Sequence, residues 1–181
     1  MGNVDLVQLT QETKKLTAMI VEDEKVTNEL LSSTFKNFFS DVYSCFNGSE
    51  ALETYNRTKP DVVFVDIVMA GMDGIELSRK IREIDATQII IVISASNDIE
   101  KISESIEVGV NSFILKPIDT KKIIELLTSV LAMIAKKKKI ETKTFSISLP
   151  LDLYEVVNEN AKAESISKNA VIIRALRSFY E

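Results

Sequence analysis

The sequence predicts a doubly wound α/β domain, built on a five-stranded parallel sheet, followed by a small C-terminal module that dimerises. Two patterns support this prediction. From residue 16 to 135, short apolar runs alternate with segments of helical periodicity. After four lysines at 136–139, the pattern changes to one alternating strand and two helices. We therefore divide the chain into a leader (1–15), the α/β domain (16–135), a Lys-rich linker (136–142) and the C-terminal module (143–181).

Each strand is predicted from a short run of apolar or β-branched residues. Several of these runs are apolar on successive residues, as expected for strands that are buried on both faces of a parallel sheet. The five runs are 16–21, 42–46, 62–65, 89–93 and 112–115. Between them, apolar residues three or four apart predict helices that begin near Val26, Ile75 and Ile99 and one over 123–134, for which Asp119 is a plausible N-cap.

Composition excludes several kinds of chemistry. The chain has no histidine and one cysteine, Cys45, so histidine catalysis, histidine metal ligands and thiolate zinc clusters are excluded. A bound metal would have to be a hard cation on oxygen ligands. No apolar run approaches the roughly 20 residues of a membrane span. With a polar N-terminus and a single cysteine, we expect a cytoplasmic protein with no membrane partner.

Charge is distributed unevenly along the chain. Residues 1–135 carry 13 Lys and Arg against 21 Asp and Glu, a net charge of −8, whereas residues 136–181 carry 9 against 6, a net charge of +3. An acidic front and a basic rear indicate modules with different partners, although a Lys-rich stretch is equally compatible with a solvated linker.

Charged and hydroxyl groups stand where the predicted strands end. Glu22 and Asp23 follow the first strand, Asp66 ends the third, Ser94 follows the fourth and Lys116 follows the fifth. In a doubly wound sheet these ends meet at one edge. Three carboxylates close together resist joint ionisation, and Mg²⁺ would relieve that conflict. The metal and Lys116 would then stabilise a phosphoryl group transferred to Asp66.

These residues stand in motifs that resemble the receiver domain of bacterial two-component response regulators. The motifs are Val21-Glu-Asp-Glu24, Asp61-Val-Val-Phe-Val-Asp66, Met69-Ala-Gly-Met-Asp-Gly74, Ile93-Ser-Ala95 and Phe113-Ile-Leu-Lys-Pro117. The resemblance implies a flavodoxin-like fold in which a sensor histidine kinase phosphorylates Asp66. It also implies Mg²⁺ on Glu22, Asp23, Asp66 and the carbonyl of Val68. A cis bond before Pro117 and a switch through Ser94 and Phe113 are implied as well.

Residues 143–181 resemble ribbon-helix-helix DNA-binding domains, which lay a two-stranded ribbon in the major groove. The resemblance rests on the strand Thr144-Phe-Ser-Ile-Ser-Leu-Pro150 and the helix start Ser165-Ile-Ser-Lys-Asn169. It implies a homodimer that reads double-stranded DNA through the outward side chains of Thr144, Ser146 and Ser148. Backbone N–H groups at Ser167, Lys168 and Asn169 would hold a phosphate. Many members have glycine at the position of Ser165.

The sequence therefore predicts a transcriptional regulator whose DNA binding is controlled by phosphorylation of Asp66, through dimerisation on the surface of 99–108, 112–115 and 123–134. Two alternatives remain open. The C-terminal module could bind itself or a protein partner and not DNA. The chain could instead be an aspartate-nucleophile phosphohydrolase, but such enzymes usually have an acid two residues after the nucleophile, where this chain has Val68. We expect no enzyme activity beyond autophosphorylation from a phosphodonor and slow loss of the phosphate.

Overall fold

The computed structural model describes residues 6–95, 98–141 and 149–164. It also describes seven single positions near the C-terminus: 167, 168, 171, 172, 174, 175 and 178. The chain divides into two compact units, Met1–Thr142 and Lys143–Glu181. No helix in the described ranges is long and apolar enough to cross a membrane.

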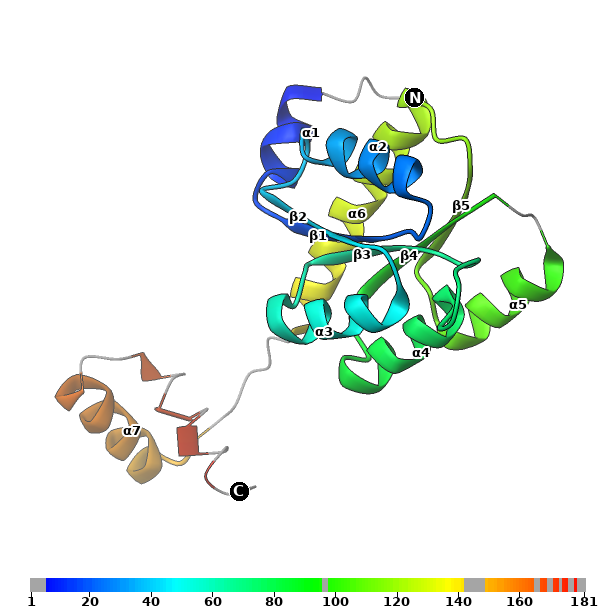
Figure 1. Cartoon of the computed structure of the whole chain (residues 1–181). Coiled ribbons are helices and arrows are strands. Elements are labelled where there is room, and N and C mark those ends of the chain that lie inside the picture. Colours follow the sequence, from blue (N-terminus) through cyan, green and yellow to red (C-terminus); the bar gives the residue numbers. More distant parts are fainter. Residues whose placement is uncertain are drawn as a thin grey trace. The chain divides into compact units, whose positions relative to one another are not determined.

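The first unit is built on a five-stranded sheet in which every pair of neighbouring strands is parallel (Figure 1). The strand order is β2-β1-β3-β4-β5, the doubly wound order in which β1 lies between β2 and β3. The predicted α/β sheet is therefore confirmed. The strands are β1 (Thr17–Val21), β2 (Asp41–Cys45), β3 (Val62–Asp66), β4 (Ile89–Ser94) and β5 (Ser112–Leu115).

Helices cover both faces of this sheet (Figure 1). One apolar cluster joins α1, α2 and α6 to one face, where Phe35, Phe39 and Phe64 pack with ring centroids 4.6–5.9 Å apart. A second cluster joins α3 and α4 to the other face around Tyr55 and Leu77. The helices of this unit are α1 (Leu6–Thr13), α2 (Lys25–Phe35), α3 (Gly48–Thr58), α4 (Gly74–Ile84), α5 (Ile99–Val108) and α6 (Thr120–Glu141).

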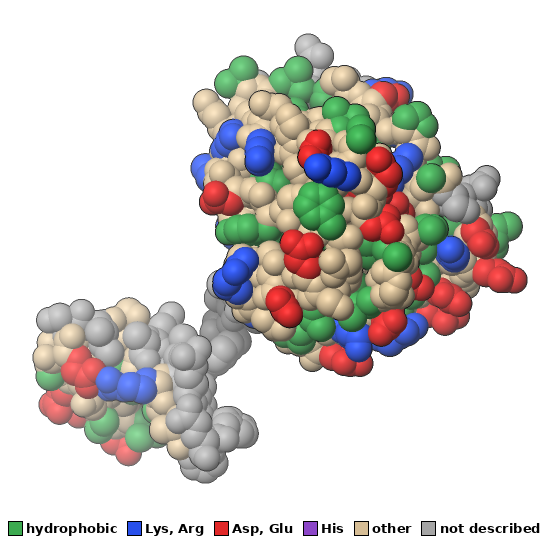
Figure 2. Space-filling model, in the orientation of Figure 1, with side chains coloured by type: hydrophobic (Ala, Val, Ile, Leu, Met, Phe, Trp, Pro, Cys, Tyr) green, Lys and Arg blue, Asp and Glu red, His purple; other side chains and the backbone are tan. Residues whose placement is uncertain are grey.

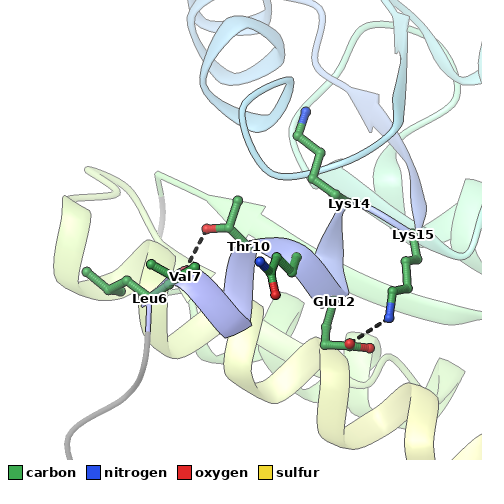
Figure 3. A pocket seen from close by; sticks show the side chains of 7 residues that line it. Leu6, Val7, Thr10, Glu12, Lys14 and Lys15 are labelled. Carbon is green, nitrogen blue, oxygen red and sulfur yellow. Dashed lines mark hydrogen bonds and ion pairs between the residues drawn. The ribbon is translucent and has the colours of Figure 1, made fainter.

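The predicted leader contains a helix that belongs to the core. Helix α1 packs on α6 (Figure 3). Its Leu9 is buried in the cluster around Phe35. The Nζ of Lys14 donates to the carbonyls of Lys36 (2.8 Å) and Phe39 (3.1 Å), and so ties the chain to the end of α2. An open groove of about 820 Å³ runs along α1, with Leu6 exposed beside it.

Helix α3 was not among the segments that periodicity identified. Its mean hydropathy is low, but Asn47 caps it by accepting from the amide of Glu50 (2.9 Å), and Ala51 and Tyr55 lie four residues apart on its buried face. An N-cap followed by two core residues four apart was the signal available in the sequence. At the start of α6, Asp119 accepts from the amide of Lys122 (2.8 Å), which confirms the predicted cap.

The Lys-rich segment is largely helical. Helix α6 continues through Glu141, so most of residues 136–142 belong to it. Lysine is a good helix former and its charge suits the negative end of the helix dipole, so the lysine run extends the helix. Lys137 also pairs with Asp85 (3.4 Å), which holds this part of α6 on the first unit.

The second unit contains α7 (Leu151–Ala163), as the sequence predicts. Beyond it, Lys168, Val171 and Arg174 are helical, and the amide of Val171 donates to the carbonyl of Ser167 (3.2 Å). Most of the predicted strand lies outside the described residues, because 142–148 are not among them.

Candidate functional site

Three of the predicted site residues meet at the carboxyl ends of the strands. Asp66 ends β3, Glu22 follows β1, and Lys116 follows β5 on the far side of the sheet. The ammonium of Lys116 donates to Oδ2 of Asp66 (2.7 Å) and to Oε2 of Glu22. The sheet therefore brings together groups that are 94 residues apart in the chain.

This ion-paired cluster is largely buried. Glu22 is 3% exposed and Asp66 is 7% exposed, while the side chain of Lys116 is 20% exposed. Burial and the neighbouring charge of Asp66 raise the pKa of Glu22, although Lys116 opposes this shift. Burial also disfavours the charged ammonium of Lys116, but its hydrogen bonds to the two carboxylates outweigh this and raise its pKa. The ammonium is thus the countercation that the two carboxylates share.

A buried asparagine, which sequence reasoning missed, fixes the loop that carries Glu22. Asn28 on α2 is fully buried, and its Nδ2 donates to the carbonyls of Glu22 and Cys45, at 2.8 Å each. Its Oδ1 accepts from Ser32 (3.2 Å) and from Ser44. The signal in the sequence was a polar residue inside the helical segment that begins near Val26, with serine four residues later.

The loop after β3 is shaped by contacts with the acidic residues. Asp23 accepts from the amide of Ala70 (2.9 Å), and so links the β1 and β3 loops. Gly71 has a φ of +76°, a left-handed conformation that favours glycine. Gly74 begins α4 directly against β3, where an added Cβ would lie 2.0 Å from the carbonyl oxygen of Asp66. Gly74 is therefore required by close packing, not only by a turn.

The remaining predicted receiver residues surround this cluster. Ser94 ends β4 and is fully buried, and its carbonyl accepts from the amide of Lys116 (2.8 Å). The Lys116–Pro117 peptide bond is cis, as the resemblance implied. Phe113 is half-buried against the cluster that contains Tyr55. Val68 is exposed, and its amide donates to Oδ1 of Asp66 (3.3 Å).

The donor set suits Mg²⁺ in kind, since Glu22, Asp23 and Asp66 offer hard carboxylate oxygens at one edge of the sheet. As they stand, no three acidic or cysteine side chains in the described ranges are grouped closely enough to hold a metal ion. The reason is visible in the hydrogen bonds, because Lys116 takes one oxygen each from Glu22 and Asp66, while Asp23 turns to the Ala70 amide. A cation that entered here would compete with those donors.

The residues predicted to contact DNA are described only in part. Thr144, Ser146, Ser148 and Asn169 lie outside the described residues. The Nζ of Lys168 donates to the hydroxyl of Tyr154 (2.6 Å) and lies 4.4 Å from the centroid of its ring, which ties this position to α7. The carbonyl of Ser167 accepts the helical hydrogen bond from Val171.

Comparison with known proteins agrees with the site geometry. The family described as "Response regulator receiver domain" matches residues 18–128. The fold also matches the crystal structure of the N-terminal domain of an uncharacterized protein from Wolinella succinogenes, with 32% sequence identity and a TM-score of 0.63 over 68% of this chain and 99% of that chain.

Two further structures are similar at lower identity. One is a putative response regulator from Chloroflexus aurantiacus, with 26% identity and a TM-score of 0.60 over 66% of this chain and 99% of that chain. The other is the CheX–CheY–BeF3–Mg²⁺ complex from Borrelia burgdorferi, with 29% identity and a TM-score of 0.59 over 67% of this chain and 92% of that chain. With the family match covering more than half of its length, the chain belongs to the response regulator receiver family.

Proposed function

We propose that this protein is a cytoplasmic two-component response regulator in which Asp66 accepts a phosphoryl group from a sensor histidine kinase. One observation carries the proposal: the ammonium of Lys116 bridges Asp66 and Glu22 at the carboxyl ends of the strands. This ammonium is already placed to stabilise negative charge on an oxygen of the phosphoryl group that is transferred to Asp66.

The residues of the site divide the work of phosphoryl transfer. The carboxylate of Asp66 is the nucleophile, and the amide of Val68 orients one of its oxygens. Mg²⁺, held by Glu22, Asp23, Asp66 and the carbonyl of Val68, would neutralise charge on the phosphoryl oxygens. Ser94 and Phe113 would respond to the phosphate, as the switch of the family implies.

The phosphorylation test has a matched control next to the opposite end of the strand that carries Asp66. Asp61 stands just before β3, where its carboxylate accepts from the amide (2.8 Å) and hydroxyl (3.0 Å) of Thr17, far from the opposite end where Asp66 lies. We expect the wild type and Asp61→Asn to gain one acid-stable, base-labile phosphoryl group from acetyl phosphate and Mg²⁺, seen by mass spectrometry. Asp66→Asn should gain none, and EDTA should prevent the reaction. A phosphorylated Asp66→Asn variant would refute the assignment.

We further propose that the second unit binds double-stranded DNA as a homodimer. The unit itself has five Lys and Arg against five Asp and Glu, but the lysines at 136–139 precede it in the chain and favour phosphate. Ser167 and Lys168 stand at the start of a helix, where backbone N–H groups hold anions. In this small unit, α7 leaves Leu151, Leu153, Tyr154 and Val156 exposed. Exposed apolar side chains of this kind are what a second copy would cover.

Control of DNA binding is proposed to pass through receiver dimerisation. The surface of α5, β5 and α6 exposes the apolar side chains of Ile99, Ile106 and Leu115. Ile99 and Ile106 belong to the apolar pattern that predicts α5, but they do not pack inside the receiver. A second receiver would bury these side chains, and linking two receivers would raise the effective concentration of the two DNA-binding units.

Selection of duplexes from a random pool, with and without beryllofluoride and Mg²⁺, tests the output. We expect the wild type to enrich one DNA sequence from the pool. A triple variant with Thr144→Ala, Ser146→Ala and Ser148→Ala should show no such enrichment. Dimerisation without any duplex affinity would favour the alternative, a protein-interaction module. Multiple turnover on p-nitrophenyl phosphate would instead support a phosphohydrolase. The exposed Val68 disfavours that function, because its side chain cannot donate a proton to a leaving group.

A further inference from the structure

A lysine-lined pocket lies at the amino ends of β3 and β4, at the opposite end of the sheet from Asp66. Its volume is about 300 Å³, and Lys59, Lys137 and Lys138 line it together with Asp61, Asp85 and Gln88. We call this feature the basal lysine pocket. It joins the α3–β3 turn, the α4–β4 turn and the end of α6.

Both carboxylates of the basal lysine pocket are occupied by neighbours within the protein. Asp61 accepts two hydrogen bonds from Thr17. Asp85 accepts from the amide and hydroxyl of Thr87, at 2.7 Å each, and pairs with Lys137. With three lysines against two aspartates, the lining of the pocket carries a net charge of +1.

Lys59 differs from the other lysines of the pocket in its surroundings. It ends α3 in a left-handed conformation with a φ of 44°, and its ammonium lies 4.6 Å from the centroid of the Tyr55 ring, not on a described carboxylate. Tyr55 and Gln88 are buried beneath it, joined by a hydrogen bond of 3.1 Å. The ring of Tyr55, fixed by its hydrogen bond to Gln88, therefore holds the ammonium of Lys59 at the pocket.

The rest of the receiver would repel a nucleic acid. Residues 1–142 carry 17 Lys and Arg against 22 Asp and Glu, a net charge of −5, and Figure 2 shows Asp and Glu side chains gathered over α4 and α5. A DNA strand brought close to this unit is favoured only where lysines gather, because phosphate neutralisation supplies most of the non-specific affinity.

Few residues separate the end of α6 from the first proposed base contact. Helix α6 ends at Glu141, and Thr144, the first proposed base contact, follows three residues later. Three residues span at most about 10 Å. Lys138 lies about 4.5 Å before the end of the helix. Since the major groove is about 12 Å wide, phosphates border any residue that reaches base edges within it.

We propose that the basal lysine pocket binds the phosphate backbone of the operator, so that the receiver itself contacts DNA beside the proposed ribbon. This inference rests on the proposed DNA-binding function of the second unit. Lys59 and Lys138 supply the phosphate contacts, while Lys137 holds the end of α6 through Asp85. The contact adds affinity without sequence preference.

The test compares two double variants of the full chain. Lys59→Gln/Lys138→Gln removes two charges from the pocket and leaves the Lys137–Asp85 pair intact. Lys25→Gln/Lys121→Gln removes two charges from lysines that each pair with a glutamate at i+4 (3.9 Å). Lys121 lies on α6 about 24 Å from Lys137 along the helix axis. The probe is the duplex selected by the wild type, with fluorescence anisotropy as a function of salt.

We expect the pocket variant to lower the salt slope by about 1 for each lysine removed. Its affinity should fall by the same factor for the selected duplex and for a scrambled one. The control variant should match the wild type. Equal slopes for the two variants would overturn the inference while leaving DNA binding by the second unit intact, and a wild type without duplex affinity would overturn both.

Acetylation of lysines gives a second, direct readout on the wild type. Bound duplex should protect Lys59 and Lys138 from acetic anhydride, as measured by mass spectrometry, and should leave Lys25 and Lys121 reactive. Protection confined to residues after 142 would place the DNA on the second unit alone and refute the contact.

Discussion

Replacing Lys116 by methionine isolates the electrostatic role of the ammonium at the candidate site. The substitution keeps an unbranched side chain only one atom shorter but leaves Glu22 and Asp66, both nearly fully buried, without the cation that they share. Removing one partner of a buried ion pair costs about 3–5 kcal/mol. Because the side chain of Lys116 is partly exposed and therefore screened, we expect a loss of about 3 kcal/mol in the free energy of unfolding.

The single cysteine provides an assay that reports on the receiver alone. Cys45 is fully buried at the end of β2, and burial raises the pKa of its thiol to about 11, so it reacts with a thiol reagent only after the receiver unfolds. Pulse labelling of Cys45 across a urea series in EDTA gives the unfolding midpoint. With an m value of about 2 kcal/mol/M, the midpoint should fall by about 1.5 M.

A lysine on the surface serves as the matched control. The side chain of Lys121 is 82% exposed, so Lys121→Met should change stability by less than about 0.5 kcal/mol. Mg²⁺ should restore part of the lost stability to Lys116→Met, because a divalent cation can replace the ammonium between the carboxylates. If Lys116→Met and Lys121→Met unfold at the same urea concentration in EDTA, the ion-pair reasoning is wrong.

Four further predictions concern the fold that supports the site. Gly74→Ala should cost about 3 kcal/mol, because its Cβ would clash with the Asp66 carbonyl. Gly71→Ala, which meets open space but keeps a positive φ, should cost about 1–2 kcal/mol in the same urea assay. Leu9→Ala should destabilise the receiver by about 3 kcal/mol in that assay, and an unchanged midpoint would mean that α1 is not part of the core. Burial raises the pKa of Tyr55 to about 12, so its contribution to stability is full below pH 10 and is lost as pH rises toward 12. We expect the free energy of unfolding, measured by circular dichroism, to fall from pH 10 to pH 12 in both proteins. The fall should be smaller for Tyr55→Phe than for the wild type, by up to about 2.5 kcal/mol.

Much of the receiver could be predicted from local patterns. Five apolar runs identify the strands because a strand buried on both faces has to be apolar along its length, and Asp119 identifies the start of α6 because a helix needs an acceptor for its first amides. Helix α3 escaped because its buried residues are Gly48, Ala51, Thr54 and Tyr55, which give no run of strongly apolar residues at helical spacing. Helix α1 escaped because it is short and buries only Leu9 and Thr13, while Leu6 and Val7 stay exposed.

The sequence by itself determined which groups stand at the strand ends, because strand order and spacing place Glu22, Asp66 and Lys116 at the same edge of a parallel sheet. Only the tertiary structure decided how those groups pair. The bridging position of Lys116, the support from Asn28 and the contact that requires Gly74 all join residues from different elements. The physical reason is that local pattern specifies which face of an element is buried, while the distance between two side chains depends on how the elements pack.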